Sequence, residues 1–401
     1  MVVIEFNDAG LIVADGGGLK LESPGYAVAE GRELWVGSPA RARARLNPRR
    51  THNRFWYQLD QQPLDPSIDG GARSSADLAY AHLQSLRGAA GDAPVLLAVP
   101  GAYDNTQLGL LLGIVRATGL HPIGLVDAAV AAASTVVTHP LCLHLDAQLH
   151  RFVLTRLAGG ARVARGRADE IAKPGLAALH DAFVAAIADA FVRQVRFDPL
   201  HGAHVEQALY DRLPGWLTAL SDAPRSTLEM PAGGRSHRAS LPREVLSEAV
   251  AEAYRQIVAG IAGAVGGADR ANVSLLVSHR IAALPGLIER IERECGVACT
   301  RLDPLAVTRG ALVNADRIRS DGEALAYVTR LPGRTAAAAQ RAAPATAARI
   351  RLRDGRLWLE CEAGADVRVN GAPIEAPRAL ARGDRIEIGG QELRMMSINA
   401  P

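Results

Sequence analysis

The sequence predicts an α/β fold with mixed β-sheets, followed by a small all-β module. Continuous apolar runs at residues 93–99 and 272–277 are typical of buried strands, and each precedes a stretch with helical periodicity. Strands and helices alternate along the chain after an initial strand pair, which favours a mixed sheet. Residues 331–348 are rich in Pro and Ala and predict a linker, and residues 349–398 alternate apolar and polar side chains.

The elements of the first half follow from apolar runs and turn signals. Turn-forming residues at 7–10 separate two strand-like runs and predict a hairpin. Helical periodicity indicates helices at 75–86, 105–118 and 127–137. The strands expected here are 1–6, 11–14, 26–30, 33–37, 93–99, 121–126, 141–145 and 152–157.

The second half repeats this alternation. A polar hairpin is expected over 226–239, and a buried strand over 272–277. The helices expected here are 175–197, 242–265, 284–295 and 303–316.

Composition narrows the classes of function. The 401 residues carry 45 basic and 42 acidic side chains, so the net charge of +3 predicts no basic patch for nucleic acid. Aromatic residues make up 4% of the chain, which argues against base stacking. The densest basic stretch is expected to be a solvated helix face, and its members are Arg41, Arg43, Arg45, Arg49 and Arg50.

The sequence shows no clear pattern for membrane insertion, secretion or metal binding. No apolar run approaches the roughly 18 residues of a membrane span, and no signal peptide precedes the first strand, so we expect a soluble, cytoplasmic protein. The four cysteines are too scattered for a disulfide framework, and Cys295 and Cys299 lack a second pair at zinc spacing. No metal is therefore expected.

Residues 95–133 resemble the actin-like ATPases, specifically the DnaK-type heat-shock chaperones. The resemblance rests on Val99-Pro100, Gln107 and the Ala-rich helix start at 127–132. Residues 36–51, 273–291 and 303–312 resemble further segments of the family in the same order. Over residues 1–330 the resemblance implies a bilobed fold, with one lobe at about 1–140, another at about 141–330, and ATP and Mg²⁺ in the cleft between them.

The family's two phosphate-binding turns need glycines, because backbone N–H groups must approach the phosphates closely. In the first turn, Glu5 stands where the family has Asp, Asn7 stands at the first glycine, and Asp8 and Gly10 follow. In the second turn, Asp146 remains near its place, but Ala147, Gln148 and Leu149 replace three glycines. The side chains of Gln148 and Leu149 are expected to enter the volume of the phosphates.

Other positions of the implied nucleotide cleft also depart from the family. The adenosine-contacting turn is Ser278-His279-Arg280, in which His279 would crowd the adenine and ribose. His279 and Arg280 are interpreted either as a repurposed anion site or as a polar turn without a ligand. The chain's two lysines, Lys20 and Lys173, match no family lysine.

Three aspartates leave two interpretations open. Asp8, Asp127 and Asp146 either hold Mg²⁺ and its waters in a live ATPase, or are turn and helix-cap residues in a degenerate pocket. In the first case the metal ligands would be Asp8 and Asp146. Similarly, Phe55-Trp56-Tyr57 is either a partner-binding patch or part of a core.

The C-terminal module at 349–401 resembles the second half of a forkhead-associated (FHA) domain. The resemblance rests on the Asn370-Gly371 turn followed by Gly-Asp-x-Ile-x-Ile-Gly at 383–389. Phosphothreonine readout in that family needs Ser-x-x-His together with Gly-Arg, and residues 331–366 contain no Ser or His. We therefore expect a truncated β-module that could pair with another copy or a partner strand.

The combined expectation is a non-catalytic pseudo-ATPase that acts as a scaffold or adaptor for a protein partner, without bound ATP, Mg²⁺ or nucleic acid. The alternatives are an atypical ATP-binding switch with slow hydrolysis, and an actin-like assembly component that self-associates.

Overall fold

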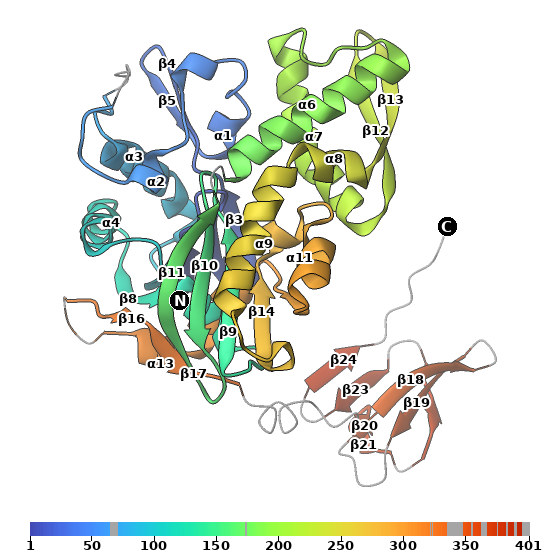
Figure 1. Ribbon diagram of the computed structural model, residues 1–401. Helices are drawn as coiled ribbons and strands as arrows, with labels where there is room; N and C mark the ends of the chain where they lie inside the picture. Colours follow the sequence, from blue (N-terminus) through green and yellow to red (C-terminus); the bar gives the residue numbers. More distant parts are fainter. Residues whose placement is uncertain are drawn as a thin grey trace. The chain divides into compact units, whose positions relative to one another are not determined.

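The computed structural model describes residues 1–64, 71–172, 175–320, 322, 324–334, 348–353, 356–361, 367–374, 376–381, 384–388 and 391–394. The chain divides into two compact units, residues 1–334 and 335–401 (Figure 1). The first is mixed α/β, and the described part of the second is rich in strands.

Two six-stranded sheets organise the described part of residues 1–334. We call them sheet I and sheet II. Sheet I has the order β16 (Tyr327–Val328), β8 (Pro122–Asp127), β7 (Val95–Val99), β1 (Val2–Glu5), β2 (Leu11–Asp15) and β3 (Gly18–Ser23). Sheet II has the order β15 (Cys299–Arg301), β14 (Val273–Val277), β9 (Leu141–Ala147), β10 (Phe152–Ala158), β11 (Arg162–Ala172) and β17 (Arg330–Pro332).

Five strands of each sheet have the same order and directions. In sheet I, β1 pairs antiparallel with β2 and parallel with β7, which in turn pairs parallel with β8. In sheet II, β9 pairs antiparallel with β10 and parallel with β14, which pairs parallel with β15. The continuous apolar runs of β7 and β14 are fully buried, as their sequences predict.

Two helices join the sheets through a shared core. Helix α5 (Ala128–Ser134) and helix α12 (Ala306–Val313) belong to one buried cluster with side chains of both sheets, including Val3 and Leu276. Gly310 of α12 lies so close to α5 that a Cβ there would be 1.8 Å from the carbonyl oxygen of Ala131. Glycine is therefore required at this helix crossing.

Other helices cover the outer faces of the sheets. Sheet I packs with α2 (Phe55–Gln58), α3 (Ser75–Ala90) and α4 (Asn105–Ala117). Phe55 and Trp56 are buried in that core, as the core interpretation of the aromatic run predicts, whereas Tyr57 is half-buried and lies outside it. Sheet II carries α6 (Leu176–Val195), α7 (Ala203–Asp222), α8 (Arg243–Ala249), α9 (Ala251–Val265), α10 (His279–Ala282), α11 (Leu287–Cys295), and the hairpin β12 (Arg225–Ala232) and β13 (Arg235–Pro242).

A small three-stranded sheet lies between β3 and α2 in sequence. It consists of β4 (Ala27–Glu30), β5 (Glu33–Val36) and β6 (Thr51–His52), with α1 (Ser38–Arg41) and the 3₁₀ helix η1 (Pro48–Arg50) before β6. The remaining short elements are the 3₁₀ helix η2 (Arg270–Asn272) and α13 (Ala315–Ile318).

The structure corrects several boundaries. The expected linker at 331–348 begins later, because β17 pairs with β11 and buries Leu331, while residues 335–347 lie outside the described residues. The chain also leaves the expected second lobe before residue 330, since β16 pairs with β8 of sheet I. The expected helix at 242–265 is two helices, α8 and α9, that meet at Val250.

The C-terminal unit contains two small sheets in its described residues. One joins β18 (Ala348–Arg353), β19 (Arg356–Cys361) and β22 (Arg378–Ala379), and the other joins β21 (Ala372–Pro373), β20 (Val367–Val369), β23 (Arg385–Ile388) and β24 (Gln391–Arg394). Their shared core is small: Leu359, Val367, Val369, Ile374 and Ile386.

Candidate functional site

The turns that follow β1 and β9 face each other and are joined by hydrogen bonds. Asn7 Nδ2 donates to Asp146 Oδ2 at 2.8 Å and to the carbonyl oxygen of Ala147 at 3.0 Å. The backbone N–H of Leu149 donates to Asp8 Oδ1 at 2.7 Å. The side chains of Asn7 and Asp8 thus connect the first turn to the second.

Arg280 completes this contact from a third element. Its helix, α10, starts where β14 ends, and Ser278 caps it by accepting from the N–H of Ile281. Arg280 Nη1 donates to Glu5 Oε1 at 3.0 Å, and Nη2 donates to the carbonyl oxygen of Gly10 at 2.8 Å. Arg280 Nη1 also lies 3.8 Å from Asp146 Oδ1. We call residues 5–10, residues 146–151 and Arg280 the two-turn junction.

The charges of the junction are buried and unequal in number. One guanidinium, that of Arg280, faces the carboxylates of Glu5 and Asp146. Burial raises the pKa of Glu5 to about 7, against the lowering effect of Arg280. Burial also raises the pKa of Asp8 to about 6. Each of these carboxylates keeps one buried oxygen, Glu5 Oε2 and Asp8 Oδ2, without a hydrogen-bond partner in the described residues.

Gln148 belongs to the junction through a residue that the sequence analysis did not single out. Arg151 Nε donates to Gln148 Oε1 at 2.5 Å, and the guanidinium of Arg151 lies 5.1 Å from the ring centre of Tyr57. The N-terminus of α6 packs on this turn so closely that a Cβ at Gly175 would lie 2.2 Å from the N of Arg151. No sequence pattern indicates a role for Arg151, because that role depends on its contacts with Gln148 and Tyr57 in the folded protein.

Asp127 has other partners. Its Oδ1 caps α5 by accepting from the N–H of Val130 at 3.0 Å, as the helix-cap interpretation predicts. Its Oδ2 accepts from the hydroxyl of Tyr327 at 3.0 Å and lies 3.5 Å from Arg165 Nη1. Burial is the largest influence on its pKa, which is raised.

The described residues contain no group of three or more His, Cys, Asp or Glu side chains that could hold a metal ion. Lys20 pairs with Asp15 at 2.9 Å on the β2–β3 hairpin, and Lys173 lies outside the described residues.

A second polar contact joins the small three-stranded sheet to the helices of sheet II. The buried side chain of Gln207 on α7 accepts from the N–H of Arg45 at 2.9 Å and donates to the carbonyl oxygen of Arg41 at 3.0 Å. Arg45 Nη2 donates to Asp181 of α6 at 2.6 Å, and its guanidinium lies 3.6 Å from the ring centre of Tyr210. We call these five residues the tip latch.

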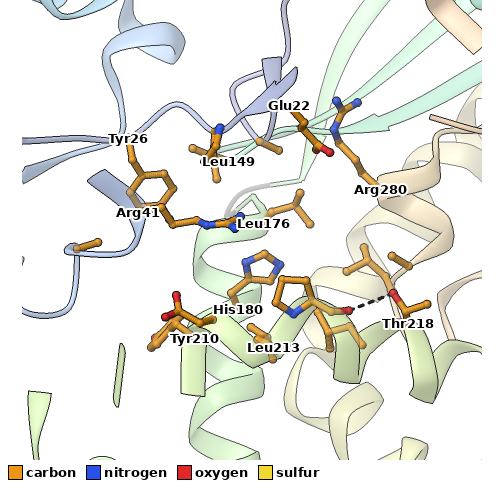
Figure 2. Close-up of a pocket in the computed structure, with 18 of the residues that line it drawn as sticks. Glu22, Tyr26, Arg41, Leu149, Leu176, His180, Tyr210, Leu213, Thr218 and Arg280 are labelled. Atoms are coloured by element: carbon orange, nitrogen blue, oxygen red, sulfur yellow. Dashed lines mark hydrogen bonds between the residues drawn. The ribbon is translucent and has the colours of Figure 1, made fainter. Parts of the chain in front are cut away.

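A cavity of about 230 Å³ lies between the two-turn junction and the tip latch (Figure 2). Both contacts contribute to its wall, as do the helices α6, α7 and α10. Its apolar lining comes from Ala9, Pro24, Ala44, Leu149, Leu176, Leu213, Pro214, Leu217, Ala283 and Leu284. Its polar lining comes from Glu22, Tyr26, Arg41, Arg45, His180, Gln207, Tyr210, Asp211, Thr218, His279 and Arg280.

Within the described residues, no helix combines the length and apolar content needed to cross a bilayer. No family model matches the chain, and no curated protein matches it.

Proposed function

We propose that residues 1–334 form a bilobed actin-like body that binds a protein partner and does not hydrolyse ATP. The repeated strand order of sheets I and II, with α5 and α12 in their shared core, supports the resemblance to the actin-like ATPases. Sheet I would then be the centre of one lobe and sheet II the centre of the other.

The observation that carries the non-catalytic part of the proposal is the direct bonding of the two turns. In the family that the chain resembles, phosphates lie between these turns and accept from their backbone N–H groups. Here Asn7 reaches across to Asp146, and the N–H of Leu149 is already bonded to Asp8. The residues present therefore do not fit a triphosphate with Mg²⁺, since a ligand would have to break three hydrogen bonds between the turns.

Exposed apolar side chains suggest where a partner could bind. Val192 and Val195 lie at the C-terminal end of α6, and Leu200 follows in the loop before α7, each at least 37% exposed. Arg193 and Arg196 lie in the same segment, and a rim of charged side chains around apolar ones is common in protein interfaces. We take this surface as the first candidate for the partner.

The C-terminal unit would offer a second contact surface. The residues that carry its resemblance to the FHA family contact one another: Asn370 Nδ2 donates to Asp384 Oδ1 at 2.8 Å, and the N–H of Arg385 donates to Asn370 Oδ1 at 2.9 Å. Asn370 and Gly371 both have positive φ, as a tight Asn-Gly turn requires. This geometry supports a half-FHA-like module, whose strand edges could pair with a partner strand.

Thermal unfolding of the full chain with and without Mg²⁺-ATP tests the proposal. A ligand that binds the native state alone raises the stability by about 2.7 kcal/mol at a hundredfold excess over its Kd. We expect no shift of the melting midpoint and no release of phosphate. A clear upward shift would instead favour the ATP-binding switch, with Asp8 and Asp146 at the metal. Sedimentation at increasing protein concentration separates a monomeric adaptor from a self-associating assembly component.

A further inference from the structure

The cavity between the two-turn junction and the tip latch has an apolar floor. Leu176 of α6, Leu213 and Leu217 of α7, and Leu284 after α10 line it, and all four are buried. Leu149 of the two-turn junction adds a fifth buried leucine. A surface of this kind favours the hydrocarbon part of a ligand, because burying apolar area stabilises a complex by about 25 cal/mol per Å².

One cation on the wall of this cavity has no charged partner. Figure 2 shows the side chain of Arg41 extending from the end of α1 toward Leu176 and His180. No carboxylate among the described residues pairs with its guanidinium, although its backbone carbonyl accepts from Gln207 in the tip latch. The other two arginines of the wall are engaged, Arg45 by Asp181 and Arg280 by Glu5.

Besides its arginines and tyrosines, the titratable groups of the wall are two histidines and two carboxylates, Asp211 and Glu22. Burial lowers the pKa of His180 to about 4 and that of His279 to about 4, so both imidazoles are neutral near pH 7. Asp211 accepts from Gln207 and belongs to the latch side, and Glu22 lies beside Arg280 in Figure 2. Of the three arginines of the wall, Arg41 is thus the one without an ion pair in the described residues, and it lies beside the apolar floor.

From these observations we propose that the cavity binds a small monoanion with an apolar body, whose carboxylate accepts from Arg41 and whose hydrocarbon part lies on the leucines. A cavity of about 150 Å³ holds benzene, and drug-sized ligands fill about 300 Å³ or more, so 230 Å³ suits a ligand of about a dozen non-hydrogen atoms. A triphosphate is larger and carries several charges, which one arginine does not balance.

Such a ligand would contact elements of both sheets. Arg41 is the last residue of α1, in the segment with the small three-stranded sheet that follows β3 of sheet I. Three of the leucines belong to α6 and α7, which pack on sheet II. An occupied cavity would therefore connect these elements beside the tip latch. This inference goes beyond the proposed scaffold role and does not depend on it. The cavity can bind the acid whether or not the protein has a partner, and whether or not it binds ATP.

Isothermal titration calorimetry of the full chain with octanoate and with 3-phenylpropanoate tests the proposal. We expect saturable binding of at least one acid below about 10 mM, and at least about tenfold weaker binding of the matching amides, which lack the charge. Arg41→Gln should weaken the binding of the acid at least about tenfold, and Arg41→Lys should weaken it less.

The matched control is Arg43→Gln. Arg43 is two residues from Arg41 in sequence, but its guanidinium lies over Trp35 and does not line the cavity, so the substitution removes the same charge outside the cavity. It should leave the affinity unchanged. Equal binding to wild type and Arg41→Gln, or no saturable heat with either acid, would overturn the proposal, as would displacement of the acid by Mg²⁺-ADP. These outcomes can be distinguished from those of the thermal unfolding test, because a shift of the melting midpoint with Mg²⁺-ATP would indicate binding at the two-turn junction and not at Arg41.

Discussion

The two-turn junction connects sheet I to sheet II, whereas the tip latch connects the region of the small three-stranded sheet to the helices of sheet II, and the two contacts differ in chemistry. The junction buries a guanidinium between two carboxylates, whereas the latch relies on the neutral amide of Gln207 and an ion pair of Arg45 that solvent reaches. Removing one member of a buried ion pair leaves an uncompensated charge, so the junction should be sensitive to the loss of Arg280. The latch leaves Arg41 unpaired beside a cavity. The difference suggests that the junction is structural and that the latch region is open to ligands.

The largest expected effect comes from removing the cation of the junction. Arg280→Gln leaves Glu5 and Asp146 buried without their common partner, which should lower the free energy of unfolding by about 3–5 kcal/mol. Urea titration measures this change. The control is Arg309→Gln at an exposed pair with Asp303, for which we expect about 1 kcal/mol or less. A loss at Arg280 no larger than at Arg309 would contradict the structural role of the junction.

The second effect is a pH dependence at Glu5. Its pKa is raised from 4.5 to about 7 in the folded protein, so the native state holds this proton more tightly than the unfolded chain. Ionisation of Glu5 therefore lowers the stability as the pH rises from 4.5 to 7, by about 3 kcal/mol in all. Glu5→Gln does not titrate, so its stability relative to wild type should improve over that range. Urea titrations of both proteins at several pH values measure the difference, and a constant difference would rule out the raised pKa.

The third effect concerns the latch. Gln207→Ala removes the partners of the carbonyl oxygen of Arg41 and the N–H of Arg45, and each unpaired backbone group costs about 1–3 kcal/mol unless water reaches it. We expect a loss of stability at the lower end of that range, together with faster hydrogen exchange at Arg45. Gln207→Glu keeps the acceptor for Arg45 and should protect that N–H better. Unchanged exchange in Gln207→Ala would show that the latch is not closed in solution.

Much of the fold could be predicted from local sequence. The strands β1, β2, β7, β9, β10 and β14 were expected within a few residues of their observed bounds, because they are short apolar runs between turn signals. Helix α7 was missed, since Pro214 lies within it and its start resembles a loop. Strand β11 was missed because its sequence, RVARGRADEIA, has charged residues scattered through it and no continuous apolar run.

The candidate site, too, could be predicted only in part from the sequence. The resemblance placed Glu5, Asn7, Asp146, Gln148 and Arg280 at one site, and the contacts of the junction are consistent with that placement. Gln207 could not be found, because the helix that carries it was not expected, and Arg41 was expected only as part of a solvated helix face.

The sequence by itself determined which side chains stand at the two turns: Asn7, Ala147, Gln148 and Leu149, at the positions where the family that the chain resembles has glycine. The tertiary structure alone decided what those side chains bind. Asn7 and Asp146 are 139 residues apart, and Glu5 and Arg280 are 275 apart, so no local pattern encodes their pairing. Buried polar groups take whichever partner the fold brings within reach, because leaving them unpaired costs more than any local preference supplies. Here the fold brings the two turns and Arg280 to one another, and Arg41 to a cavity.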